Sequence, residues 1–528
     1  MPKATAIIPA KNTVADRKNN PNANNIPPTD SVSAANKPQK VGAKSIPNAD
    51  KELPIAVHVS TPPVNFGNPW KKIDIPIPTL KMSNPKCNNL SFVVISLIYL
   101  CLMIILNQKT TLIVYFCFIN KIDMSTFAPF SKPLYVMLKP VGALCNLRCE
   151  YCYYLEKSGL YTQNKNHVMS DELQKRFTKE YIESQTMSQI MFTWHGGETL
   201  MRPLSFYKRA IELQKQYARG RQIDNSIQTN GTLLTDEWCK FFKENNFLVG
   251  ISIDGPQDFH DEYRRDSMGR PSFQKVLRGI ELLKKHDVEF NCMAVVNDYN
   301  ADYPLEFYEF FKKIGCQYLQ FTPIVERITD DTTMKLASAK DSTAKLAPFS
   351  VLPEQWGNFL CTIFDEWIKQ DVGKIFVQLF DSILANWVGE QPGICTMAKT
   401  CGHAGVMEFN GDVYSCDHFV FPEYNLGNIY TKPLASMMYS ETQLKFGNDK
   451  FDKLPQQCRE CYFLFACNGE CPKNRFITDK YGNQGLNYLC KGYYQFFQHV
   501  APYMDFMKNE LLAQRAPANV MDWVKNNR

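Results

Sequence analysis

A short loop with three cysteines is the part of the sequence best suited to chemistry. Cys145, Cys149 and Cys152 stand at C-x3-C-x2-C spacing just after an apolar run, Pro133–Leu138, that is expected to form a strand. Thiolates bind zinc and iron–sulfur clusters, and both kinds of site usually take four ligands. A loop with three cysteines therefore predicts a cluster that keeps one iron open for a small molecule. The alternative is a zinc knuckle with His167 as its fourth ligand, although this spacing is not the paired C-x2-C typical of zinc.

A second set of cysteines lies near the C-terminus. It consists of Cys395, Cys401, Cys416, Cys458, Cys461, Cys467, Cys471 and Cys490. Eight thiolates fill two four-cysteine sites, and the residues alone suit two iron–sulfur clusters and two zinc ribbons about equally. The other seven of the 18 cysteines are scattered and are expected to be core residues or bystanders. Tight groups in a chain of 528 residues indicate metal ligands rather than a disulfide framework.

One carboxylate stands directly beside this second set. Asp417 follows Cys416, so it would lie next to a ligated thiolate and could accept a proton as an electron leaves. The alternative is a turn formed by Asp417 and His418, because aspartate is common in turns. The residues alone leave both interpretations open.

The first 123 residues differ from the rest of the chain. They carry 14 Lys and Arg against 6 Asp and Glu, a charge of +8, whereas the remainder carries 45 and 47, a charge of −2. The main body is nearly neutral, which gives no electrostatic reason to expect nucleic-acid binding.

This leader is expected not to form a packed core. Residues 1–86 hold 14 of the 31 prolines, and Leu90–Leu106 is an apolar run about as long as a short membrane span. One interpretation is a membrane anchor behind a disordered leader. The other, which we favour, is an over-long gene start with translation beginning at Met124, because the leader's composition is unlike the rest and the cluster chemistry gives a membrane no evident task. It implies a cytoplasmic protein without a membrane contact.

From Met124 onward, strands and helices alternate. Six strands are expected at Pro133–Leu138, Ile190–Trp194, Ser226–Gln228, Leu248–Ile253, Glu289–Val296 and Tyr318–Pro323. The helices between and after them are expected at Ser170–Ser184, Leu204–Tyr217, Asp236–Asn245, Phe273–Lys285, Pro304–Ile314 and Pro353–Gln370. This α/β order predicts a parallel sheet with helices outside, either open or partly closed as a barrel. Right-handed crossovers place the C-terminal ends of all strands on one rim, where the polar motifs fall.

The cysteine loop, with aromatic residues around it, resembles the cluster loop of radical S-adenosylmethionine (SAM) enzymes. Gly196-Gly197-Glu198, after the second strand, is similar to the Gly-Gly-Glu motif of that family. The resemblance implies a partial (β/α)6 TIM-like barrel of radical SAM type, with S-adenosyl-L-methionine at the open iron. It also implies contacts to that cofactor from Tyr151, Gly197, Ser252, Arg264 and Val325. Where relatives carry Gln before the motif, this chain has His195, which could equally be a core histidine at a strand end.

The order of the C-terminal spacings resembles the cysteine-rich SPASM domain of the same enzymes. That resemblance implies two auxiliary [4Fe–4S] clusters, and three with the cluster of the first loop. Cys395, Cys401, Cys416 and Cys471 would ligate one auxiliary cluster. Cys458, Cys461, Cys467 and Cys490 would ligate the other.

The cysteine loop, the Ser252–Pro256 turn, His260 with Arg264, and Tyr414–His418 together resemble the anaerobic sulfatase-maturating enzymes. This implies oxidation of a cysteine or serine side chain in a sulfatase precursor to Cα-formylglycine, with Asp417 as proton acceptor. The substrate would be an unfolded sulfatase polypeptide with the motif Cys/Ser-x-Pro/Ala-x-Arg, and a flavodoxin or ferredoxin would donate electrons. One alternative is a SPASM-type enzyme that makes thioether or carbon–carbon crosslinks in a small precursor peptide. Another is a non-catalytic, membrane-tethered electron carrier.

These patterns divide the chain into five parts. The predicted parts are a leader (1–123), the radical SAM barrel (124–340), a helical connector (341–392), the SPASM domain (393–500) and a helical tail (501–528).

Overall fold

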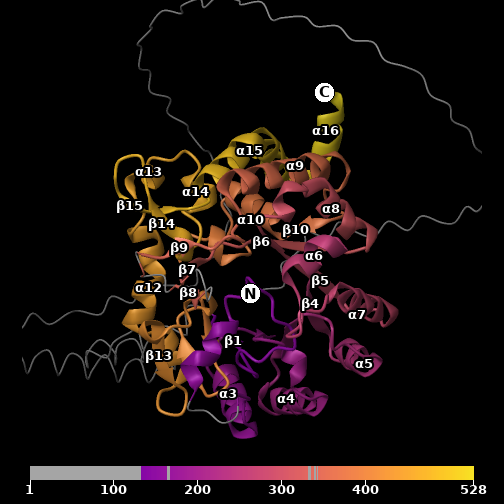
Figure 1. Ribbon diagram of the computed structural model, residues 1–528, viewed down its shortest axis with the longest axis vertical. Helices are drawn as coiled ribbons and strands as arrows, with labels where there is room; N and C mark the ends of the chain where they lie inside the picture. Colours follow the sequence, from indigo (N-terminus) through magenta and orange to yellow (C-terminus); the bar gives the residue numbers. More distant parts are fainter. Residues whose placement is uncertain (1–132, 163–166, 331–334, 338–340, 342, 528) are drawn as a thin grey trace, which may run out of the picture. The chain divides into compact units, whose positions relative to one another are not determined.

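The computed structural model describes residues 133–162, 167–330, 335–337, 341 and 343–527, all of which belong to one unit of the chain (Figure 1). The predicted leader and the predicted start at Met124 lie outside these residues. None of the described helices is both long and apolar enough to span a membrane.

A ten-stranded sheet organises the fold. Its first six strands are β1 (Tyr135–Leu138), β2 (Gln189–Trp194), β3 (Gln222–Thr229), β4 (Phe247–Ser252), β5 (Phe290–Val296) and β6 (Tyr318–Pro323). They are parallel neighbours in chain order, as the alternating pattern predicts. β10 (Phe376–Val377) extends the sheet beside β6, again in parallel. The third strand is longer than expected, because its polar residues from Gln222 onward also pair with β2.

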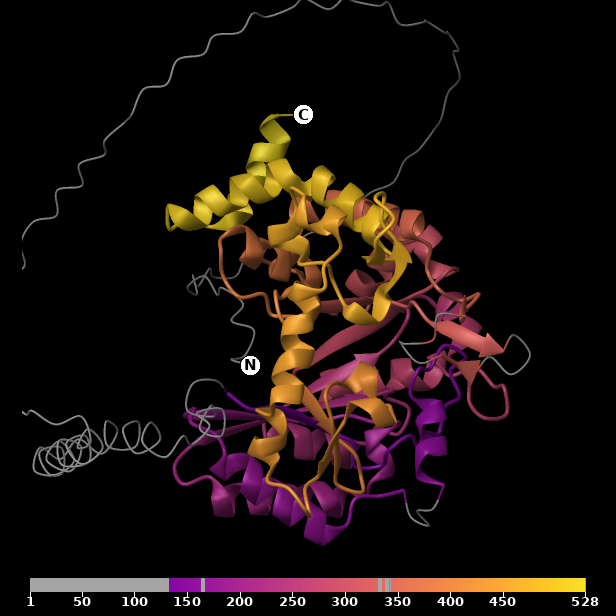
Figure 2. The ribbon, with the colours of Figure 1, turned by 90° about the vertical axis from the view of Figure 1, so that its left-hand side faces the viewer.

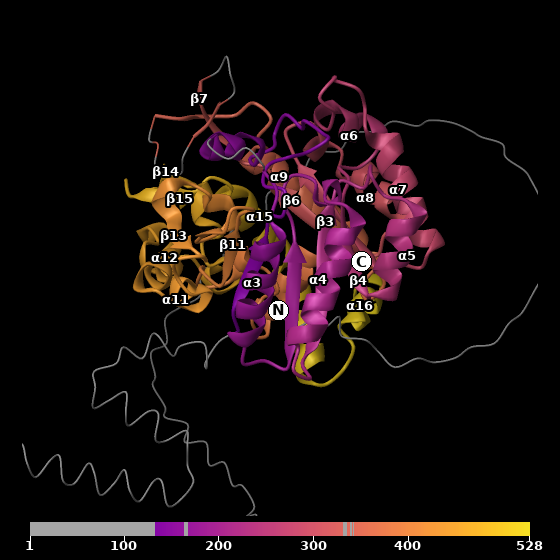
Figure 3. The ribbon, with the colours of Figure 1, turned by 90° about the horizontal axis from the view of Figure 1, so that it is seen from below.

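The helices between these strands cover the outer side of the sheet (Figures 1 and 3). They are α3 (Asp171–Glu183), α4 (Leu204–Tyr217), α5 (Asp236–Glu244), α6 (Gln257–Tyr263), α7 (Phe273–Lys285) and α8 (Pro304–Lys313). Each turns an apolar face inward, as α7 does with Val276, Ile280 and Leu283 at helical spacing. Ser170 caps α3 by accepting a hydrogen bond from the Leu173 amide at 3.1 Å, which confirms the expected helix start.

The C-terminal cysteine-rich part continues the same sheet on the other side of β1. Its strand β11 (Ala404–Met407) pairs in parallel with β1, and β12 (Asp412–Tyr414) and β13 (Asn425–Asn428) follow in antiparallel order. Figure 2 shows this orange segment against the indigo strands. Strand pairing therefore fixes the position of the C-terminal cysteines relative to the first cysteine loop.

The remaining elements surround this arrangement. They are the small sheet β7 (Arg327–Asp330), β8 (Lys335–Leu336) and β9 (Lys345–Leu346), the hairpin β14 (Arg475–Thr478) and β15 (Gln484–Asn487), and the helices α9 (Pro353–Gln370), α10 (Gln378–Trp387), α11 (Leu434–Met438), α12 (Glu441–Asp452), α13 (Gln456–Arg459), α14 (Leu464–Cys467), α15 (Cys490–Leu512) and α16 (Val520–Asn526). Helices α9 and α15 pack so closely that a Cβ at Gly492 would lie 2.1 Å from the carbonyl oxygen of Pro353. Helix α15 runs without a break across residue 500, where the patterns place a domain boundary.

Candidate active site

The first cysteine loop follows β1 and is held by the segment after β4. The Arg148 amide donates to the carbonyl of Arg265 at 2.7 Å, and the Glu150 amide to that of Tyr263 at 3.1 Å. The three thiols are half-buried. Burial raises the pKa of Cys149 to about 12, and nearby Cys152 and Cys145 also raise it, whereas Arg264 lowers it. Bound metal would offset this cost, because thiols are deprotonated when they ligate.

Hydrogen bonds of the Gly-Gly-Glu motif connect this loop to the ends of β2 and β3. The Gly197 amide donates to the Gly142 carbonyl, and the Glu198 amide to the Leu144 carbonyl, both at 2.8 Å. A Cβ at Gly197 would lie 2.0 Å from the oxygen of Leu144, so only glycine permits this approach. The motif thus positions the cysteine loop directly, a role that the sequence analysis did not assign to it.

Glu198 is fully buried and hydrogen-bonded at the end of β3. Its carboxylate accepts from the Thr229 hydroxyl at 2.6 Å, from the Asn230 amide at 2.7 Å and from the Leu200 amide at 2.9 Å. Three donors satisfy a buried anion, although burial still raises its pKa.

Two of the five residues predicted to contact the cofactor, Tyr151 and Arg264, meet in a buried cluster. Arg264 donates through Nη1 to the Tyr151 hydroxyl at 3.0 Å, and the Tyr151 hydroxyl donates to Asp254. Arg264 also lies 3.7 Å from Asp254 in an ion pair. Asp254 is not among the predicted site residues, although its place directly after an apolar strand was a usable signal.

Of the other three, Gly197 contacts the cysteine loop and Ser252 ends β4. The Ser252 hydroxyl accepts a hydrogen bond from Gln228 at 2.9 Å, as a hydroxyl bonded within its own sheet would. Val325 follows β6, and its carbonyl accepts from Lys473 of the C-terminal part at 2.8 Å.

The eight C-terminal thiols gather in two groups. For six of them, the neighbouring cysteines whose charge raises the thiol's pKa belong to the same group, after the larger effect of burial: these are Cys401, Cys416, Cys458, Cys467, Cys471 and Cys490. We name the first group proximal, because its Cys416 adjoins Asp417, which contacts Tyr153 beside the first cysteine loop. The proximal group is Cys395, Cys401, Cys416 and Cys471, and the other, distal group is Cys458, Cys461, Cys467 and Cys490. The structure thus assembles the same two sets that the resemblance implies, while their role as ligands stays a prediction.

Asp417 is held by side chains from the opposite half of the sheet. Its Oδ1 lies 2.6 Å from Nζ of Lys139, which is fully buried at the end of β1. The Tyr153 hydroxyl, next to Cys152, donates to its other oxygen. Burial raises the pKa of Asp417, but Lys139 and the nearby His195 and His418 bring it well below its ordinary value. The carboxylate is therefore ionised and lies between the first cysteine loop and the proximal group.

Lys139 also links His195 to this carboxylate. Nδ1 of His195 accepts a hydrogen bond from the Gly196 amide at 2.8 Å and lies 3.1 Å from the Lys139 ammonium. Burial and Lys139 lower the pKa of His195 to about 3, so the imidazole is neutral with Nδ1 as acceptor. The ammonium also lies 4.2 Å from the centre of the Tyr154 ring. Neither Lys139 nor Tyr154 is among the predicted site residues.

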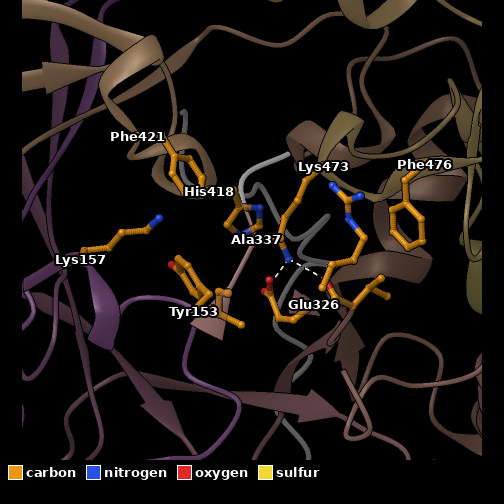
Figure 4. Close-up of a pocket in the computed structure, with 11 residues that line it drawn as sticks. Tyr153, Lys157, Glu326, Ala337, His418, Phe421, Lys473 and Phe476 are labelled. Carbon is orange, nitrogen blue, oxygen red and sulfur yellow. Dashed lines mark hydrogen bonds and ion pairs between the residues drawn. The ribbon is translucent and has the colours of Figure 1, made fainter. Parts of the chain in front are cut away.

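A pocket opens beside this array (Figure 4). Tyr153 and His418 form one side, and Lys473 crosses it to bind Glu326 at 2.5 Å. Its other lining residues include Lys157 and Phe421, whose ammonium and ring lie 3.3 Å apart.

The donor chemistry fits iron–sulfur clusters. One set of three and two sets of four thiols match a cluster with an open iron and two fully ligated clusters. Oδ1 of Asp417 has no hydrogen-bond partner apart from its ion pair with Lys139, so it keeps capacity to accept a proton.

Comparison with known proteins agrees with the fold and the cysteine groups described above. Residues 140–311 match the family model of the radical SAM superfamily, and residues 401–462 match SPASM, an iron–sulfur cluster-binding domain. The chain is 72% identical over 404 residues to the serine-type anaerobic sulfatase-maturating enzyme of Bacteroides thetaiotaomicron, with 76% of this chain and 98% of the relative covered. It is 31% identical over 382 residues to the cysteine-type enzyme of Clostridium perfringens, with 72% and 99% covered. The solved structure of native anSMEcpe with bound AdoMet and Cp18Cys peptide aligns with this chain with a TM-score of 0.64 and 30% sequence identity. The alignment covers 72% of this chain and 100% of the solved chain.

Proposed function

Since this chain belongs to the anaerobic sulfatase-maturating enzymes, we propose that it oxidises a serine or cysteine side chain of a sulfatase precursor to Cα-formylglycine. One observation supports this most strongly. The ionised Asp417, adjacent to Cys416, is hydrogen-bonded to Tyr153, adjacent to Cys152. A base in that place lies between the loop that would start radical chemistry and the thiols that would hold an electron acceptor.

The cofactors of this proposal are S-adenosyl-L-methionine and three [4Fe–4S] clusters. Cys145, Cys149 and Cys152 would hold the first cluster, and the proximal and distal groups the other two. When bound, these groups supply the 5′-deoxyadenosyl radical and one-electron oxidation. Tyr151, Gly197, Ser252, Arg264 and Val325 remain the proposed contacts to S-adenosyl-L-methionine, with the Arg264–Asp254 ion pair keeping the Tyr151 hydroxyl in place.

The chain's own task in the oxidation is proton transfer. Conversion of the serine CH₂OH group to an aldehyde removes one hydrogen atom, one proton and one electron. Asp417 would take the hydroxyl proton, and the Lys139 ammonium keeps the carboxylate ionised beforehand. For cysteine, the same loss gives a thioaldehyde that is then hydrolysed.

The substrate proposed is an unfolded sulfatase segment with the motif Cys/Ser-x-Pro/Ala-x-Arg, entering beside the pocket of Figure 4. The serine-type names of several relatives, at 72% and 35% identity, support serine as an accepted target. A flavodoxin or ferredoxin in the cytoplasm is the proposed electron donor. The five-part division of the chain stays a prediction.

The test uses two peptides that differ only in serine or cysteine at the target position, with an alanine peptide as control. Anaerobic enzyme should form 5′-deoxyadenosine and an aldehyde that reacts with hydrazine reagents from the first two only. Cys149→Ala should abolish cofactor cleavage, and Asp417→Asn should cleave cofactor but form little aldehyde. Cofactor cleavage without aldehyde, together with a crosslink in a small peptide encoded nearby, would instead assign the chain to the crosslinking enzymes.

A further inference from the structure

Two cations, one buried and one partly buried, lie where the proximal and distal cysteine groups meet. The first is Lys450 of α12, whose side chain is fully buried. Its ammonium donates to the carbonyls of Cys395, Thr396 and Ala398 at 2.7, 2.8 and 2.5 Å. All three of its donor hydrogens are used on the turn that carries a proximal-group cysteine.

The second cation is Arg475, at the start of β14. Its guanidinium donates to the carbonyls of Gly469, Asn468 and Glu470 at 2.8, 3.0 and 3.1 Å. These are the three residues between Cys467 of the distal group and Cys471 of the proximal group. Its remaining nitrogen donates to the Lys450 carbonyl at 2.5 Å, so the two cations form one connected bridge.

The segment that Arg475 holds has an uncommon backbone. Asn468, Gly469 and Glu470 all have positive φ, at 48°, 70° and 51°. Non-glycine residues rarely adopt this region, and such a run persists only where its surroundings impose it. A Cβ at Gly469 would lie 2.6 Å from Nη2 of Arg475, so the glycine makes room for the guanidinium. The backbone carbonyls of these three residues therefore surround the Arg475 guanidinium, between the proximal and distal cysteine groups.

Neither cation is neutralised by a carboxylate. Among the ion pairs of the described residues, Lys450 and Arg475 have no acidic partner within 4.0 Å, because their acceptors are uncharged carbonyls. A buried carboxylate beside the bridge, that of Glu470, instead accepts hydrogen bonds from Asn474 and Asn487 at 3.1 and 2.6 Å. Two positive charges therefore accompany one carboxylate, and of these three side chains Lys450 and Glu470 are buried and Arg475 is partly buried.

We propose that Lys450 and Arg475 are positioning residues that raise the reduction potentials of both auxiliary clusters, a proposal that rests on the cluster-binding role given above to the two cysteine groups. Reduction adds one electron, hence one negative charge, to a cluster site. A fixed positive charge nearby stabilises that state, and a low dielectric strengthens the effect. The bridge would thereby favour acceptance of the single electron that leaves the substrate after its hydrogen atom and proton are removed.

The test is an anaerobic redox titration of the holoenzyme, monitored by electron paramagnetic resonance without substrate. Lys450→Met and Arg475→Met should lower the auxiliary potentials, and Arg475→Lys should keep them close to wild type because it keeps the charge. Lys445→Met is the matched control, since Lys445 lies on the same helix, is 70% exposed and pairs with Asp449. It should leave the potentials unchanged.

Unchanged potentials in Lys450→Met and Arg475→Met, at full iron content, would overturn the proposal. If Arg475→Met loses iron, the Lys variant decides: full iron and a wild-type potential in Arg475→Lys support a requirement for charge. Equal loss of iron in both Arg475 variants would show that hydrogen-bond geometry is what matters and would reject the electrostatic role. The titration needs no sulfatase peptide, so its failure is distinct from a failure to form formylglycine.

Discussion

Replacement of Lys139 by methionine tests how Asp417 is kept ionised. The Lys139 side chain is 0% exposed, and its ammonium lies 2.6 Å from Asp417, whose side chain is 16% exposed. Methionine has a similar length but no charge, so it leaves the carboxylate without its cation. In this variant, burial is the main remaining influence, and it raises the pKa of Asp417.

The structure sets the size of the effect. At this separation and an effective dielectric constant of about 20, two unit charges attract by roughly 6 kcal/mol before desolvation is counted. Removal of one partner from a buried pair typically costs about 3–5 kcal/mol, because the other charge stays buried and unpaired. We expect a loss of folding free energy in that range, and aldehyde formation reduced by at least about tenfold at neutral pH.

The pH dependence has a definite sign. In the wild type, the depressed pKa means that the ion pair stabilises the fold above the unfolded-state value near 3.8, and this contribution is lost as pH falls through the folded value. In Lys139→Met, the pKa of Asp417 is raised, so the ionised carboxylate costs stability, and lower pH relieves that cost. The difference in urea midpoint from wild type should therefore shrink between about pH 8 and about pH 6, while the loss of aldehyde formation grows.

Asp417→Asn in the Lys139→Met background is the control. With no carboxylate left, the double variant should regain stability relative to Lys139→Met, and the coupling energy of the cycle measures the pair. Cofactor cleavage should persist in all of these variants. A Lys139→Met protein with wild-type stability and an unchanged pH profile of aldehyde formation would refute the reasoning.

Two further predictions concern the metal sites. Metal analysis of anaerobically purified protein should find about twelve irons per chain and little zinc, since one set of three and two sets of four thiols suit three cubane clusters; stoichiometric zinc would contradict this. Gly197→Ala should lose about a third of that iron and all cofactor cleavage, because its Cβ would lie 2.0 Å from the Leu144 oxygen. Gly159→Ala, with no atom within 4 Å of the added Cβ, should retain both, and equal behaviour of the two variants would show that the close approach does not matter.

The order of strands and helices could be predicted from the sequence because each element carries its own periodic signal. The six parallel strands lie at the expected places, and Ser170 starts its helix as expected. The three sets of cysteines could also be recognised, because their spacing is local or follows a known order. The pairing of β1 with β11 could not be predicted, since the two strands are far apart in the sequence and neither carries a signal for its partner.

The environment of the candidate base was missed for the same reason. Asp417 could be named from its place after Cys416, but its partner Lys139 precedes it by 278 residues. The sequence shows Lys139 only as a cation at the end of an apolar strand, where an exposed side chain is the ordinary expectation. The choice left open for His195 depended in part on the same contact, because burial and Lys139 together lower the pKa of the ring and keep it neutral.

The continuous sheet explains why these distant residues meet. Leu138 pairs with Met407, and the amide of Lys139 donates to the Met407 carbonyl at 2.9 Å, so β1 and β11 end together. Lys139 then points from the end of β1 toward the turn after β12, where Cys416 and Asp417 lie. The distance between the first cysteine loop and the proximal group is therefore set by backbone hydrogen bonds rather than by a flexible domain contact. The proposed base is thereby held in a fixed position beside the pocket at which the polypeptide is proposed to enter.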